Sequence, residues 1–189
     1  MQEHPNAISA TNNLARTYYG LEKYADAEKL QIHVIYARVR VLGEEHPDTI
    51  SAMWNLARMY HGLEKNADAE ELYVYIVDAR TRLLGEEHPD TISAMGNLTK
   101  TYFGLEKYAD AEEVQIHVVD ARKRLLGEEH LDTISDMKNL AQMYYKLAKY
   151  TDAERLLVHL EDARRRLFGE LQVRKIPSKC TLFLANSRT

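Results

Sequence analysis

A period of 42 residues constrains the fold of this chain more than any other feature of its sequence. The phrase LGEEHPDTISAM occurs unchanged at residues 42–53 and 84–95, and a third copy at 126–137 differs only at Leu131 and Asp136. Alignment on the histidine of the phrase gives four copies, which start at His4, His46, His88 and His130. Self-similarity at a fixed period indicates an array of structural repeats, each of which packs on its neighbours.

Each copy predicts two helices. The copy that starts at His46 illustrates the pattern of the first helix. Asp48 or Thr49 is expected to cap the helix N-terminus beside Pro47. The apolar residues that follow have helical spacing: Met53, Leu56, Ala57 and Tyr60. Gly62 is expected to end this helix in the left-handed conformation that glycine adopts readily.

The second helix of the same copy follows the turn LEKNADAE. Its predicted buried stripe consists of Ala69, Leu72, Ile76, Ala79 and Leu83. Gly85 is expected to stop the helix. The phrase GEEHPD is therefore interpreted as the turn between one helical pair and the next, which explains why it recurs.

Composition narrows the function classes. The 189 residues include 25 Lys and Arg against 29 Asp and Glu, for a formal net charge of −4. Phosphate binding needs a basic excess, so we expect no nucleic-acid partner. Cys180 is the single cysteine, which is compatible with a reducing compartment. Neither a signal sequence nor an apolar run of membrane length is present, and the sequence predicts a cytoplasmic protein without a membrane partner.

No motif indicates catalysis or metal binding. The recurring histidines fall in turns, where we expect a turn or capping role, because equivalent positions of stacked repeats lie too far apart to share a metal ion. A glycine-rich phosphate loop, a nucleophile elbow and an HExxH pattern are all absent from the sequence. We therefore expect no catalytic residues, no metal, no cofactor and no enzymatic activity.

The spacing of Leu56, Ala57, Tyr60 and Ala69 resembles the tetratricopeptide repeat, whose usual unit is shorter. The combination of NLA-x-x-Y, KYADAE and R-x-LGEEHPDT looks like the kinesin light chain type of this repeat, which also occurs in C-terminal arrays of NTPase-based sensor proteins. Three positions depart from the pattern: Leu131 replaces Pro, Lys146 replaces Gly and Thr99 replaces Ala.

The resemblance implies an all-α fold, a right-handed superhelical solenoid of four helix-turn-helix tetratricopeptide-like repeats. The array would span residues 4–169, with repeats at about 4–45, 46–87, 88–129 and 130–169, followed by a non-repeat tail at 170–189. It also implies that the first helices line a concave groove that binds an extended peptide or partner segment. By analogy with the family, the groove residues are Asn12, Asn13, Arg16 and Tyr19 in the first copy; Trp54, Asn55, Arg58 and His61 in the second; Gly96, Asn97, Lys100 and Phe103 in the third; and Lys138, Asn139, Gln142 and Tyr145 in the fourth.

These residue types suit peptide binding. A side-chain amide both donates and accepts hydrogen bonds, so a row of asparagines can pair with the backbone of a guest peptide. The cationic row of Arg16, Arg58 and Lys100 favours a partner with acidic residues. Trp54 stands where other copies have Asn, Gly or Lys, so the repeat does not require it and we expect it to anchor a partner. The alternatives are that the asparagines bridge helices and that the cations are merely solvated.

The function predicted from the sequence is a protein–protein interaction scaffold. Two alternatives stay open. One is a structural module that self-associates through uncapped ends, since near-identical units stack on each other. The other is the sensor arm of a larger NTPase-based signalling protein.

Overall fold

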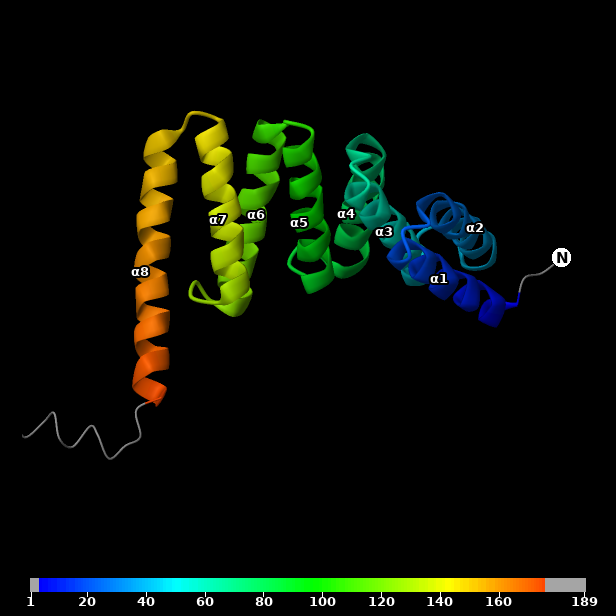
Figure 1. Ribbon diagram of the computed structural model, residues 1–189, viewed down its shortest axis with the longest axis horizontal. Coiled ribbons are helices and arrows are strands. Elements are labelled where there is room, and N and C mark those ends of the chain that lie inside the picture. Colours follow the sequence, from blue (N-terminus) through cyan, green and yellow to red (C-terminus); the bar gives the residue numbers. More distant parts are fainter. Residues whose placement is uncertain (1–3, 176–189) are drawn as a thin grey trace, which may run out of the picture. The chain divides into compact units, whose positions relative to one another are not determined.

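The computed structural model describes residues 4–175, with side chains described as far as Arg166, and this part of the chain contains eight α-helices and no strand. The helices are α1 (Pro5–Gly20), α2 (Tyr24–Leu42), α3 (Pro47–Gly62), α4 (Asn66–Leu84), α5 (Pro89–Gly104), α6 (Tyr108–Leu126), α7 (Leu131–Lys146) and α8 (Tyr150–Lys175). Successive helices form hairpins joined by short turns (Figure 1). The predicted all-α fold of helix-turn-helix repeats is confirmed.

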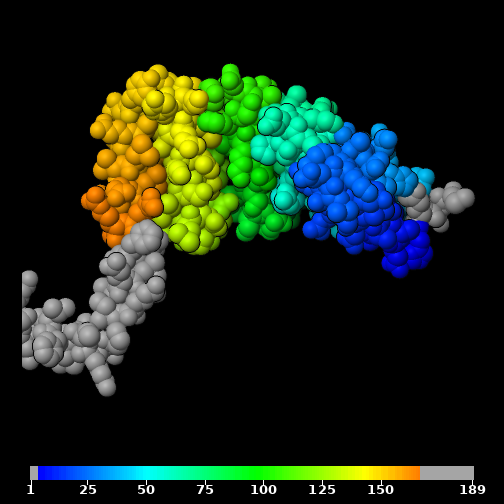
Figure 2. Space-filling model, viewed as in Figure 1, coloured from blue at the N-terminus to red at the C-terminus, as the bar shows by residue number. Residues whose placement is uncertain are grey.

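The described chain forms two compact units, which divide within α6 between Val118 and Val119. In the first unit, α2 packs against both α1 and α3, and α4 packs against both α3 and α5. The space-filling view shows the first hairpin in close contact with the second (Figure 2). In the second unit, α7 packs against α8.

Small and apolar residues from consecutive helices build the core of the first unit. One cluster joins Met53 and Ala57 of α3, Tyr73 and Ile76 of α4, and Leu98 of α5. Burial of these side chains against the following hairpin, at roughly 25 cal/mol per Å² of apolar surface, holds each repeat on its neighbour. The second unit has a separate cluster of Val119, Met137, Leu140 and Leu160.

Histidine, and not Asp48 or Thr49, caps the first helix of each repeat. The Nδ1 atom of His46 accepts a hydrogen bond from the backbone N–H of Asp48 at 3.1 Å, and α3 starts at Pro47. The same bond recurs at His4, His88 and His130, with N···N distances of 3.2 to 3.3 Å. Because this bond is made by the histidine, α7 starts in the same way although Leu131 replaces proline.

The prediction that Gly62 adopts the left-handed conformation at the end of the first helix is wrong, because that conformation occurs two residues later. Gly62 is the last residue of α3, and the left-handed residue is Glu64, with φ of 60°. Glu22, Glu106 and Ala148 take the same conformation in the other copies. The expectation for Gly85 is confirmed, since it follows α4 with φ of 93°, a value that favours glycine.

Three of the five residues in the predicted stripe of the second helix are fully buried, whereas Leu72 is only half-buried and its neighbour Tyr73 is buried instead. Ala69, Ile76 and Ala79 are fully buried, whereas Leu83 is 47% exposed. Leu83 lies in the last turn of α4, where the cluster formed with α3 and α5 no longer covers the helix. In the last copy, α8 continues through the glycine at 169 to Lys175.

Candidate interaction surface

A pocket of about 240 Å³ opens between α1 and α3. Its lining residues are Arg16, Tyr19, Asn55, Arg58 and Met59. Arg16 and Tyr19, like Asn55 and Arg58, lie three residues apart on one helix, so each pair shares a face. Met59 is buried with Ala15 and Ala27, which fixes the base of the pocket in the core. Four of the five lining residues are among the groove residues predicted from the sequence.

The pocket is cationic. Arg16 and Arg58 are both exposed, and neither makes an ion pair with any residue that the structure describes. The side-chain amide of Asn55 likewise has no hydrogen-bond partner among the described residues. Two guanidinium groups and one amide therefore line the same cavity with donors available to a ligand.

Trp54 is not among the residues that line this pocket, and it has a structural role. Its ring packs against the core cluster of α3, α4 and α5, and the ring centroid lies 5.0 Å from the guanidinium carbon of Arg58 and 5.4 Å from that of Arg80. Arg80 donates a hydrogen bond to the backbone carbonyl of Asp90 at 2.7 Å, and burial lowers the pKa of its guanidinium. Within the described residues, the buried indole N–H has no acceptor. Sequence reasoning predicted only the anchoring role of Trp54, because periodicity does not reveal contacts with a following repeat.

In each copy, one predicted groove residue directly follows a tyrosine near the end of the first helix. This residue contacts the start of the second helix of the same hairpin. Tyr19 and Tyr24 make an edge-to-face contact with ring centroids 5.6 Å apart. Phe103 with Tyr108, and Tyr145 with Tyr150, repeat this contact at 5.2 and 5.5 Å. In the second copy both partners differ, and Nδ1 of His61 lies 3.2 Å from Oδ1 of Asn66 in a hydrogen bond. These predicted groove residues thus hold the first helix to the second, a role that the paired changes at both positions could have revealed.

The asparagine row has two kinds of member. Asn12 accepts a hydrogen bond from Nε2 of Gln31 at 3.2 Å, and the same nitrogen donates to the carbonyl of Ala52 at 2.9 Å. Asn12 therefore bridges helices, as the alternative interpretation expects. In contrast, the side chains of Asn13, Asn55, Asn97 and Asn139 make no hydrogen bond with the described residues.

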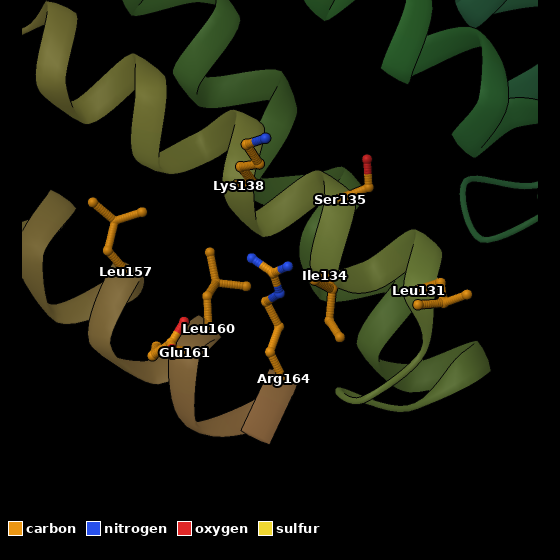
Figure 3. Close-up of a pocket in the computed structure, with 8 residues that line it drawn as sticks. All are labelled: Leu131, Ile134, Ser135, Lys138, Leu157, Leu160, Glu161 and Arg164. Carbon is orange, nitrogen blue, oxygen red and sulfur yellow. The ribbon is translucent and has the colours of Figure 1, made fainter. Parts of the chain in front are cut away.

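The remaining predicted residues are not brought into the α1–α3 pocket. In the third copy Lys100 is exposed, and Gly96 and Asn97 are half-buried on α5. The fourth copy belongs to the second unit, where Asn139 is half-buried and Gln142 is exposed. Lys138 lines a different pocket of about 380 Å³ between α7 and α8 (Figure 3).

Ion pairs fix neighbouring repeats of the first unit in register. Lys65 of the second copy pairs with Glu28 of the first at 2.7 Å, and Lys107 of the third pairs with Glu70 of the second at 2.5 Å. The hydroxyl of Tyr60 donates to Glu28 at 3.2 Å. Burial, reinforced by the charge of Glu28, raises the pKa of Tyr60 to about 12.

Metal-ligand clusters and membrane-spanning helices are both absent from the described residues. No group of three or more His, Cys, Asp or Glu side chains there is arranged to hold a metal ion. None of the helices in the described residues combines the length and apolar character needed to cross a membrane.

Comparison with known proteins places the repeats in a family. The sequence profile of the tetratricopeptide repeat matches residues 6–74 and 100–166, which together make up more than half of the chain. No curated protein sequence matches the chain.

Solved structures share the fold. One is a putative kinesin light chain from Podosopora anserina with nearly identical TPR-like repeats, and another is a variant of the same protein. Each superposes with a TM-score of 0.78 at 24% sequence identity, and the match covers 88% of this chain and 79% of the other chain. BtubC (BKLC) from P. vanneervenii superposes with the same TM-score at 20% identity, over 88% of this chain and 67% of its own. The resemblance of the fold to kinesin light chain repeats is thereby confirmed, and the chain belongs to the tetratricopeptide repeat family.

Proposed function

We propose that this chain is a protein–protein interaction scaffold that binds an extended peptide segment along its first helices, with an acidic side chain of the peptide in the pocket between α1 and α3. The family generally provides scaffolds of this kind and is typically non-enzymatic. One observation carries the proposal for this chain: two exposed arginines from successive repeats line one pocket, and neither has an ionic partner among the described residues.

The chemistry of the pocket favours a carboxylate. A guanidinium group donates two parallel hydrogen bonds to a carboxylate, and a hydrogen bond to a charged group contributes about 1.5–3 kcal/mol. Arg16 and Arg58 approach the cavity from different helices, so both can contact one acidic group. A carboxylate also relieves the repulsion between two guanidinium groups that share a small volume.

The neighbouring residues suit the rest of a peptide. Asn55 can pair with a peptide backbone group whatever the adjacent side chain is. Tyr19 contributes an aromatic wall, and aromatic residues are enriched at energetically important interface positions. The pocket therefore selects for an acidic residue in an otherwise permissive sequence.

A randomised peptide library tests the proposal. We expect peptides selected on the full chain to carry Asp or Glu at one fixed position. The variant R16A/R58A is expected to lose this enrichment and to weaken binding of the selected peptides at least tenfold, which is about 1.4 kcal/mol. Lys29→Ala is a matched control, because Lys29 is an exposed cation on α2 that does not line the pocket.

Two results would contradict the proposal. In one, the selected peptides show no acidic position. In the other, R16A/R58A and K29A bind them equally well, which would assign any binding to general surface charge.

A further inference from the structure

The last described hairpin carries an open apolar pocket between α7 and α8. The residues that line it are Leu131, Ile134, Ser135 and Lys138 of α7 and Leu157, Leu160, Glu161 and Arg164 of α8. Figure 3 shows the side chains of Leu160 and Arg164 on the side of α8 that faces Ile134. The cavity volume is about 380 Å³.

Equivalent positions in the first two repeats are covered by the first helix of the following repeat. Gln31 and Tyr73 occupy the place of Leu157 in the first and second copies, and they are 0% and 1% exposed. Gln31 donates to the carbonyl of Ala52 in α3, and Tyr73 packs in one cluster with Leu98 of α5. Leu157 is 51% exposed. In the earlier repeats, this face is covered by the first helix of the next repeat. In the last repeat, none of the described first helices covers it, and the pocket is left open.

Helix α1 shows the reciprocal face. Leu14 is 43% exposed, whereas its equivalents Leu56 and Leu98 are 5% and 4% exposed. Ala10 is exposed, whereas its equivalent in α5, Ala94, is fully buried in the cluster that α5 forms with α3 and α4. The surface with which α5 covers the second hairpin is therefore present on α1 and uncovered.

The charges of the two faces match in the same register. Inside the first unit, the glutamate of one repeat pairs with the lysine of the next in both Glu28–Lys65 and Glu70–Lys107. The glutamate at this position in the last copy is Glu154, and the lysine at this position in the first copy is Lys23; both are exposed. Lys23 lies 5.4 Å from the ring centroid of Tyr18, as Lys65 lies 5.2 Å from that of Tyr60. Lys23 is therefore already held in the position from which Lys65 reaches its glutamate.

We propose that the α7–α8 face binds α1 of a second copy of this chain, so that copies join head to tail through a junction that repeats the α2–α3 and α4–α5 contacts. Leu14 and Ala10 of one copy cover Leu157 and Leu160 of the other, and Lys23 pairs with Glu154. A contact of this type is heterologous, and it generates open chains unless the rotation between copies closes a ring. This inference does not depend on peptide binding in the α1–α3 pocket.

Sedimentation velocity of the full chain, from low micromolar to several hundred micromolar concentration, tests the proposal. The sedimentation coefficient is expected to rise with concentration. Leu157→Arg places a charge at the centre of the junction and is expected to weaken association roughly tenfold or more. Val158→Arg is the matched control, because Val158 is 58% exposed, does not line the pocket, and has an equivalent, Val74, that stays 38% exposed in a covered repeat.

Charge reversal provides a test that does not remove apolar surface. Glu154→Lys and Lys23→Glu are each expected to weaken self-association about threefold to tenfold, the range for one exposed ion pair replaced by repulsion. An equimolar mixture of the two variants is expected to associate more strongly than either variant alone, because a junction that joins Lys23 of one variant's α1 to Glu154 of the other again pairs opposite charges. Circular dichroism of each variant confirms that the helices are retained.

Three outcomes would overturn the proposal. The first is a wild-type chain that stays monomeric over the whole concentration range. The second is equal association of the Leu157→Arg and Val158→Arg variants. The third is association that appears only after deletion of residues 176–189, which would assign the face to the chain's own C-terminal segment.

Discussion

The hydroxyl of Tyr19 in α1 lies over Gly62 in α3, so close that a β-carbon on residue 62 would overlap the phenol oxygen. The glycine is needed because the side chain of the preceding repeat occupies the space, and not because of its backbone conformation. Asn66 lies over Gly104 in a similar way, with its Nδ2 atom 2.7 Å from the position of a β-carbon. Gly20 has no such neighbour within 4 Å.

We therefore predict opposite effects for the same substitution in two repeats. Gly20→Ala is expected to raise the free energy of unfolding by up to about 1 kcal/mol, because alanine favours the helix and meets no atom. Gly62→Ala is expected to lower it by about 1–2 kcal/mol, because Tyr19 must move. Urea unfolding of both variants measures the difference.

The double variant Y19F/G62A tests whether the effect of G62A comes from the contact with the Tyr19 hydroxyl or from a change in helix propensity. Removal of the phenol oxygen removes the nearest overlapping atom, so the double variant is expected to be more stable than G62A alone. If Y19F leaves the effect of G62A unchanged, the contact does not explain the glycine.

A second prediction concerns the histidine caps. His46→Ala is expected to lower the free energy of unfolding by about 1 kcal/mol, because the N–H of Asp48 loses its acceptor. His46→Asn is expected to retain most of the stability, because asparagine is a favourable N-cap residue. Thermal unfolding monitored by circular dichroism tests both, and equal midpoints for the two variants would show that the bond does not stabilise α3.

A third prediction concerns the aspartate that replaces alanine in the fourth copy. Asp136 is 9% exposed, and its Oδ2 lies 2.6 Å from Nε of Arg122, without the alignment of a hydrogen bond. Arg122→Met is expected to lower the free energy of unfolding by about 2–4 kcal/mol, since it removes a cation that pairs with a buried carboxylate. The double variant R122M/D136A is expected to recover most of this loss. Equal stability of R122M and the double variant in urea would show that the ion pair does not compensate the charge of Asp136.

A fourth prediction follows from the tyrosines between repeats. The pKa of Tyr60 is raised from 10.0 to about 12, first by burial and then by Glu28. Burial also raises the pKa of Tyr73 and Tyr102. A phenol with a raised pKa loses its proton more easily in the unfolded chain, so its stabilising effect is complete below pH 10 and is lost as the pH rises from 10 towards 12.

Melting temperatures measured between pH 8 and pH 11 are therefore expected to fall steeply above about pH 10. Tyr60→Phe is expected to make this fall shallower, although the variant loses the hydrogen bond to Glu28. An identical slope for the variant and the wild-type chain would exclude Tyr60 as a contributor.

The helical hairpins could be predicted from the sequence because the period, the apolar spacing and the turn phrase agree with one another. Residues that act between repeats could not. Gln31 is polar yet fully buried, because it bonds to Asn12 and to α3, whereas Leu83 is apolar yet exposed at a helix end. Helical periodicity describes one helix at a time, and these positions depend on what the neighbouring repeat places against them.

The His46 cap and the pocket between α1 and α3 also depend on geometry that a single sequence does not reveal. Several polar residues near Pro47 were plausible caps, and only the backbone geometry selects His46. The family resemblance supplied Arg16 and Arg58 as groove residues, but their position on one pocket depends on how α1 packs against α3. The second function of Trp54, as a core residue beside Arg80, left no signal in a single sequence.

NMR can map which residues of the chain a library-selected acidic peptide contacts, and so locates the binding surface itself. We predict chemical-shift changes at Arg16, Tyr19, Asn55 and Arg58, together with the indole N–H signal of Trp54, and no changes on the exposed faces of α2 and α4. Changes confined to α2 and α4, with the signals of the two arginines unmoved, would contradict the assignment of the first helices as the binding surface.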